Sequence, residues 1–217
     1  MLLHRRNFML AAATATATAT ATALAAGSAQ AWNSTDVSGA LPPLQFTMTR
    51  AADGKRVTAA DYRGKIVLLY FGYTSCPDVC PTTLLNASTM LKSLGARADA
   101  VRVLFVTVDP DRDTLAVMKD YAGSFAPQVV GLRGTPDELA ALAKRYRVAY
   151  SVKKVGDSFE VTHGTAVYVF DRDGAIKLLF TDLETPGAKL AAMTADLAAM
   201  IDGGGRLGLW RRIRNWL

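Results

Sequence analysis

Two cysteines four residues apart are the side chains in this sequence with the widest choice of chemistry. Cys76 and Cys80 are the only cysteines among its 217 residues. Residues i and i+4 share one face of a helix, so both sulfurs would project from a helix that begins beside them. The positive end of the helix dipole favours thiolate over thiol there. Two adjacent thiolates can close a disulfide or hold a soft metal such as Cu(I).

A single histidine is the third candidate ligand. Of the two histidines, His4 lies in a segment that we expect to be removed, which leaves His163 in the mature protein. Two thiolates and one imidazole form a three-coordinate set that suits Cu(I), and that can hold Cu(II) with an added water or carboxylate. A structural zinc site normally needs four protein ligands, and no fourth is evident, so the set favours copper over zinc.

Alternating strands and helices must position these residues. The apolar run Ile66-Val67-Leu68-Leu69 is typical of a strand buried on both faces, and the cysteines follow it directly. We expect strands at 45–49, 56–58, 65–70, 101–108, 129–132, 150–155, 159–161, 165–170 and 175–180, and helices at 82–94, 113–125, 135–146 and 185–201. This order predicts an α/β fold with a mixed central sheet flanked by helices, and with an N-terminal β-hairpin extension formed by the first two strands.

The position of the cysteines bears on their role. A structural disulfide is the ordinary expectation for two cysteines in an exported protein. A bond between Cys76 and Cys80 would close only a five-residue loop, however, and would add little stability. The pair also follows a buried strand, at the carboxyl end where open α/β sheets place their binding sites. The position therefore favours a reactive or metal-binding pair over a purely structural disulfide.

The N-terminal segment has the features of an export signal. Arg5-Arg6 precede an Ala/Thr run over 11–26, and Ala29-Gln30-Ala31 is a small-x-small cleavage site. These features predict a signal peptide over 1–31, of either the ordinary secretory or the twin-arginine kind, with an uncleaved anchor as a third reading. Export places the protein in the periplasm or at the extracytoplasmic face of the membrane, an oxidising compartment.

The remaining chain divides into three segments. We expect an extended lead-in over 32–43, one domain over 44–202, and a glycine linker with a basic amphipathic tail over 203–217. The net charge of +6 comes from two leader arginines and four tail arginines, so residues 32–205 are neutral and a nucleic-acid-binding surface is not supported. Apolar and arginine residues alternate at helical spacing over 206–217, which suits a short helix in a membrane surface. A disordered cationic end and a tail packed on the domain are the alternatives.

The sequence resembles the Sco/SenC family. The resemblance covers about residues 40–201 and rests on Tyr70-Phe71-Gly72-Tyr73-Thr74-Ser75-Cys76-Pro77-Asp78-Val79-Cys80-Pro81-Thr82, on Val108-Asp109-Pro110-Asp111-Arg112-Asp113-Thr114, on Gly131-Leu132-Arg133-Gly134-Thr135 and on the late His163. It implies a thioredoxin-like fold and a copper chaperone for cytochrome c oxidase assembly.

The resemblance also implies roles for particular residues. Cys76, Cys80 and His163 would be the ligands of one copper per chain, and Asp109 would lie near the site and influence copper binding or release. The family often has an acidic residue before the histidine and Ser or Thr after it, where this sequence has Thr162 and Gly164. The ligand is therefore kept, but its surroundings differ from the family pattern.

Three functions compete for the cysteine pair. As a metallochaperone, the protein would take copper from a donor and deliver it to the binuclear copper site of cytochrome c oxidase subunit II, with or without thiol reduction of that acceptor. As a thiol–disulfide oxidoreductase, it would use Cys76 and Cys80 as a redox pair with a thiol reductant as partner. Their spacing is one residue longer than Cys-x-x-Cys, and His163 occupies the place where thioredoxins have a cis-proline, which favours metal.

A thiol peroxidase is the third and least supported function. It would need a threonine and an arginine beside the reactive thiolate, for which Thr83 and either Arg133 or Arg147 are available. No spacing argument supports that set.

We expect Asp111 and Asp113 to serve as loop and helix-cap residues, and a monomer is the default oligomeric state.

Overall fold

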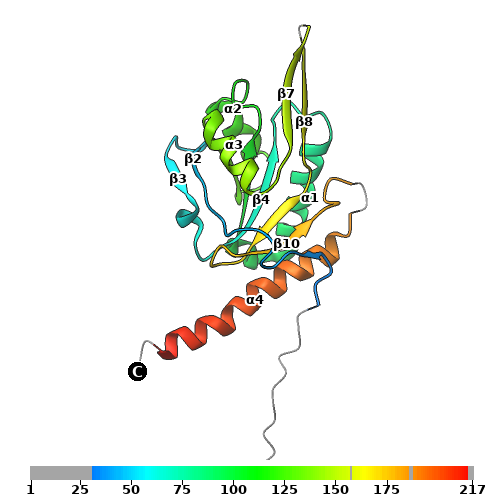
Figure 1. The fold of residues 1–217 in the computed structure, drawn as a ribbon. Helices are drawn as coiled ribbons and strands as arrows, with labels where there is room; N and C mark the ends of the chain where they lie inside the picture. The colour runs from blue at the N-terminus through cyan, green and yellow to red at the C-terminus, as the bar shows by residue number, and fades with distance from the viewer. Residues whose placement is uncertain (1–30, 157, 186–187, 215–217) are drawn as a thin grey trace, which may run out of the picture. The chain divides into compact units, whose positions relative to one another are not determined.

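A mixed eight-stranded sheet forms the centre of the domain (Figure 1). The computed structural model describes residues 31–156, 158–185 and 188–214, with side chains described up to residue 203. The strands of the main sheet, in spatial order, are β1 (Thr35–Asp36), β10 (Ile176–Phe180), β9 (Val167–Phe170), β4 (Ile66–Gly72), β5 (Val101–Thr107), β6 (Val129–Arg133), β2 (Thr47–Arg50) and β3 (Arg56–Thr58). Strands β4, β5 and β6 are parallel, and the other pairings are antiparallel. The predicted mixed α/β sheet is therefore confirmed.

Helices cover both faces of this sheet. They are α1 (Val79–Leu94), α2 (Leu115–Gly123), α3 (Pro136–Arg145) and α4 (Leu190–Arg214), with short 3-10 helices η1 (Ala59–Tyr62) and η2 (Gly95–Ala100). Apolar side chains of α1, α2 and α4 belong to one hydrophobic core, and those of α3 belong to the core on the opposite face. The predicted flanking helices are thus present on both faces.

The central strand β4 shows why its sequence is apolar throughout. Ile66, Leu68 and Tyr70 point into the core beneath α1, whereas Val67, Leu69 and Phe71 point into the core beneath α3. Every residue of the strand is buried. A strand covered on both faces needs apolar side chains at successive positions rather than at alternate ones, and β4 ends at the cysteine loop.

The expected N-terminal hairpin joins the main sheet. Strands β2 and β3 pair with each other, and β2 also pairs with β6. The segment predicted as an extended lead-in, 32–43, contains β1, which pairs with β10. The buried Asp196 carboxylate of α4 accepts bonds from the backbone and side chains of Asn33 and Ser34, and these bonds hold the segment against the domain.

Helix α4 differs from the prediction at both ends. The sequence predicts a helix over 185–201 followed by a glycine linker, but the helix begins at Leu190 and continues through Gly203, Gly204 and Gly205 to Arg214. Each glycine weakens a helix by about 1 kcal/mol without forbidding the conformation, so the linker assignment was wrong for the backbone. Among the described residues, no helix is both long and apolar enough to cross a membrane.

Two strands form a separate antiparallel hairpin. Strand β7 (Tyr150–Val155) and strand β8 (Ser158–His163) pair with each other and with no strand of the main sheet among the described residues. Figure 1 shows this hairpin extending away from the end of the sheet, above α3 and α1. Its last residue is His163, so the candidate histidine is carried by this hairpin.

Candidate metal centre

Helix α1 begins earlier than the sequence predicts, which places Cys80 in its first turn. The expected start was Thr82, and the observed first residue is Val79, after the N-cap Asp78. The Asp78 side chain makes no capping bond, and the sulfur of Cys76 accepts the backbone N–H of Cys80 at 3.4 Å instead. Cys76 is half-buried in the preceding loop and Cys80 is fully buried, and both are free thiols.

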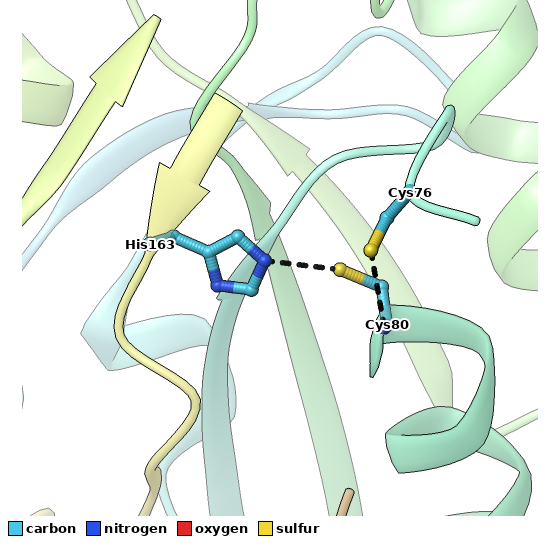
Figure 2. A group of neighbouring side chains, drawn as sticks. All are labelled: Cys76, Cys80 and His163. Carbon is cyan, nitrogen blue, oxygen red and sulfur yellow. Dashed lines mark hydrogen bonds between the residues drawn. The ribbon is translucent and has the colours of Figure 1, made fainter. Parts of the chain in front are cut away.

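The structure brings the three predicted ligands together. One ligand atom from each of Cys76, Cys80 and His163 lies within 4.8 Å of the other two. Figure 2 shows the cysteines approaching from the loop and the helix, and His163 approaching from the end of β8, with its Nε2 3.3 Å from the sulfur of Cys80. The sequence could only predict that each residue lies near the mouth of the sheet. The approach of the hairpin to α1 completes the cluster.

Hydrogen bonding fixes which nitrogen of His163 faces the sulfurs. Its Nδ1 lies 3.0 Å from the backbone carbonyl of Gly164, which only accepts, so Nδ1 carries the proton. Nε2 therefore presents a lone pair to Cys80. Because the partner is a backbone carbonyl, glycine at position 164 supplies it as well as any other residue would, and the departure from the family pattern does not remove this contact.

The protonation of Cys80 differs from the expectation for a helix N-terminus. Burial raises the pKa of the Cys80 thiol to about 12, and this effect outweighs the hydrogen bonds that favour its thiolate. The expected preference for thiolate is therefore wrong for Cys80 in the metal-free protein. The protonated sulfur can donate to the lone pair on Nε2 of His163, so a metal ion must displace this proton.

Two aromatic rings enclose the histidine. The imidazole makes edge-to-face contacts with Tyr70, whose ring centroid is 6.1 Å away, and with Tyr73, at 5.9 Å. Desolvation lowers the pKa of His163 below its ordinary value, so the ring is neutral at pH 7 and available as a ligand. Sequence reasoning missed both tyrosines as site residues, although their positions beside the cysteine motif were a usable signal.

A buried carboxylate anchors the cysteine loop. Asp113 accepts the backbone N–H of Thr74 at 3.0 Å, the Thr74 hydroxyl at 2.5 Å and the Thr107 hydroxyl at 2.6 Å. These bonds join the loop that carries Cys76 to the carboxyl end of β5. The cap of α2 is Thr114 rather than Asp113, and the structural role of Asp113 is instead to hold the loop in place.

Replacing Asp113 by asparagine should destabilise the domain. The amide keeps the shape but cannot accept three hydrogen bonds on the same oxygens, so we expect the free energy of unfolding to fall by about 2–3 kcal/mol. Urea denaturation measures the loss. Asp111 is exposed and lies with Asp113 in the loop between β5 and α2. Asp111→Asn is therefore the matched control, with an expected change in the free energy of unfolding within about 0.5 kcal/mol. Equal losses in the two variants would contradict this role for Asp113.

Asp109 does not join the ligand cluster. Its carboxylate is buried and forms an ion pair with Arg112, and its backbone N–H donates to the Thr107 hydroxyl at 2.9 Å. The described residues contain a single group of His, Cys, Asp and Glu side chains placed to share a metal ion, and Asp109 is not part of it. Asp109 is therefore not placed to act as a metal ligand in this structure.

Two of the residues considered for a peroxidase, Thr83 and Arg133, donate to backbone carbonyls. The hydroxyl of Thr83 donates to the carbonyl of Val79 within α1, and the guanidinium of Arg133 donates twice to the carbonyl of Pro110. Arg147 has a positive φ of 57° and follows the end of α3. These bonds direct the Thr83 hydroxyl and two N–H groups of Arg133 to backbone carbonyls rather than to a cysteine sulfur.

Fold and site together define a class of protein. A mixed sheet with a cysteine pair at the carboxyl end of its central parallel strand, facing a histidine, describes a thioredoxin-like protein with a soft three-ligand site. The SCO1/SenC family model matches residues 42–200, and the chain belongs to this family.

Solved structures and curated proteins agree with this assignment. Copper-bound ScoI of Bradyrhizobium japonicum is 40% identical, with a TM-score of 0.63 over 70% of this chain and 97% of that protein. Copper-bound yeast Sco1 is 30% identical, with a TM-score of 0.64 over 73% of this chain and 90% of that protein. The mitochondrial SCO2 homolog of Bos taurus is 42% identical over 127 residues, which are 57% of this chain and 46% of that protein. The chain spans about half the length of the curated relatives it matches.

Proposed function

We propose that the protein is a copper chaperone in cytochrome c oxidase assembly. It binds one copper ion through Cys76, Cys80 and His163 and delivers it to the binuclear copper site of subunit II. The observation that carries the proposal is the convergence of two thiols and a correctly oriented imidazole nitrogen within 4.8 Å. Membership of a family with copper-bound members supports the identity of the metal.

The different burial of the two cysteines suits transfer by ligand exchange. Cys76 is half-exposed and Cys80 is buried, so an acceptor thiolate would first replace Cys76 on the copper. A second acceptor thiolate would then replace Cys80, and the two chaperone thiols would regain protons from solvent. A thiol reductant would keep both cysteines reduced, and a copper donor would load them before each transfer.

Anaerobic titration tests this proposal directly. The reduced protein is titrated with Cu(I) and then with Cu(II), followed by absorption spectroscopy and native mass spectrometry. One tightly held copper per chain supports the chaperone. If copper is not taken up, the metal function is wrong.

Thiol–disulfide exchange is the second candidate, favoured by the same difference in burial. The Cys76 thiolate would attack a partner disulfide, and Cys80 would resolve the mixed disulfide. The partner would gain two electrons and two protons, and a Cys76–Cys80 disulfide would form. Rapid reduction of a disulfide-bonded acceptor by a protein that takes up no copper would favour this function.

Copper affinity should increase with pH. Because the pKa of Cys80 is raised to about 12, this thiol stays protonated from pH 6 to 9 and must lose its proton on binding. Because this one proton is released on binding, the apparent Cu(I) affinity should rise about tenfold per pH unit. Competition titrations at pH 6.5, 7.5 and 8.5 measure the slope, and an affinity independent of pH would show that Cys80 does not release a proton.

The location of the protein is proposed from its ends. Residues 1–31 would act as a signal peptide, and the domain would work in the periplasm or at the extracytoplasmic face of the membrane. The arginine-rich segment 206–217 would hold it at the membrane surface.

Deleting 206–217 tests the role of the tail. The shortened protein is expected to leave the membrane fraction and to bind copper as before, because none of the three ligands lies in the deleted segment. Fractionation of cells and copper titration of the purified protein measure the two properties. Unchanged membrane association would contradict a role for the tail.

A further inference from the structure

The position of His163 depends on a hairpin that the main sheet does not hold. Strands β7 and β8 exchange backbone hydrogen bonds with each other and belong to a separate two-stranded sheet. Cys76 and Cys80 belong to the loop and helix that follow β4. Beyond the chain connections and the backbone bond from Gly164 to Ala149 at its base, side-chain contacts between the hairpin and the body of the domain hold His163 near the sulfurs.

The register of the hairpin places a contact residue on the same face as the histidine. Tyr150 pairs with His163, Val152 with Val161, and Lys154 with Phe159. Side chains two residues apart on a strand share a face, so Phe159, Val161 and His163 point to one side. Val161 and Tyr150 pack against the core beside α3, and Phe159 lies farther out, at 40% exposure.

Arg112 contacts the hairpin at that outer position. Its guanidinium carbon lies 4.4 Å from the centroid of the Phe159 ring, in cation–π contact. Arg112 belongs to the loop between β5 and α2, so this contact joins the hairpin to the body of the domain beyond the packed base.

A buried carboxylate holds the arginine in this position. The Arg112 guanidinium forms an ion pair and a hydrogen bond with Oδ2 of Asp109. Asp109 is only 2% exposed, and the Thr107 hydroxyl accepts its backbone N–H at the carboxyl end of β5. The guanidinium is therefore tied to the end of β5 through Asp109 in the loop that follows this strand.

We propose that Arg112 is a positioning residue for His163. Asp109 holds the Arg112 guanidinium in contact with the Phe159 ring, and this contact keeps the hairpin, with its histidine, next to the two cysteines. The expected effect on copper binding rests on the proposed function. The docking of the hairpin by Arg112 does not depend on it. In this arrangement Asp109 affects metal binding without direct contact with the metal. When the contact opens, the imidazole moves away and leaves copper on the two thiolates alone.

The metal-free protein provides the first test. In Arg112→Gln and Phe159→Leu, amide hydrogen exchange at residues 158–163 is expected to quicken roughly three- to thirtyfold, the range that corresponds to loss of one cation–π contact. The His163 ring signals in NMR spectra should shift in both variants. Phe159→Tyr keeps the ring and should behave as wild type. Arg97 pairs with Asp202 at an exposed site, so Arg97→Gln is the matched loss of an arginine.

Copper release provides the second test. Arg112→Gln and Phe159→Leu should each speed the loss of Cu(I) to a chelator by a similar factor, and the double variant should be no faster than the single ones. In a His163→Ala background, neither change should alter the rate. Phe159 is partly exposed, so its variants should fold even if Arg112→Gln does not.

Two results would overturn the proposal. One is unchanged exchange at 158–163 in the metal-free Phe159→Leu variant, and the other is an equally large effect on copper release in the His163→Ala background. Failure of the copper function gives a different pattern. The wild-type protein would then take up no copper, while the hairpin would still be freed in the variants, so positioning would stand and the metal role would fall.

Discussion

Cys80→Ser is expected to abolish tight copper binding, with a loss of roughly three orders of magnitude or more in Cu(I) affinity. A serine hydroxyl is a hard, weakly acidic donor, and it cannot replace a soft thiolate on Cu(I). The same loss is expected for Cys76→Ser, because either change leaves one thiolate and one imidazole. Anaerobic competition with a Cu(I) chelator measures the affinity.

The His163→Ala variant tests the number of ligands separately from damage to the fold. His163→Ala keeps both thiolates, so Cu(I) binding should weaken by a smaller factor, while the Cu(II) absorption spectrum changes. Far-ultraviolet circular dichroism should be the same for all three variants, since none removes a large buried apolar side chain. If His163→Ala binds Cu(I) and Cu(II) as the wild type does, the three-ligand site is wrong.

Gly72→Ala is expected to disturb the site from within the sheet. A Cβ at this position would lie 2.8 Å from the sulfur of Cys80 and 2.7 Å from Cε2 of Phe105, both shorter than real contacts allow. Phe105 is fully buried and cannot move freely. The overpacking should lower the free energy of unfolding by about 2–3 kcal/mol, and displacement of Cys80 should weaken Cu(I) binding by roughly ten- to a hundredfold.

A second glycine provides the control for this substitution. A Cβ on Gly123, in the last turn of α2, would meet no atom within 4 Å. Gly123→Ala should therefore leave copper affinity unchanged and should not destabilise the domain, since alanine is the better helix former. Thermal denaturation and copper competition compare the two variants. Equal behaviour of Gly72→Ala and Gly123→Ala would mean that the close approach at Gly72 is relieved without consequence.

Local patterns were sufficient for most of the secondary structure. The run of apolar residues at 66–71 predicted a strand buried on both faces, and Thr135-Pro136-Asp137-Glu138 predicted the capped start of α3; both are confirmed. The helix ends were less accurate. Helix α1 begins three residues before the expected start, because the sulfur of Cys76 accepts the N–H of Cys80 in place of an ordinary cap. Helix α4 continues past glycines that were read as a linker.

The sequence by itself determined the identity of the candidate ligands and the class of fold. Two cysteines in a motif after a buried strand, and one histidine in the expected mature chain, left few other choices. The tertiary structure decided what these residues can do together. Whether Cys80 is thiol or thiolate depends on its burial, and the reach of His163 depends on the docking of a separate hairpin. Spacing along the chain encodes local geometry, whereas desolvation and contacts between distant segments arise only when the chain has folded.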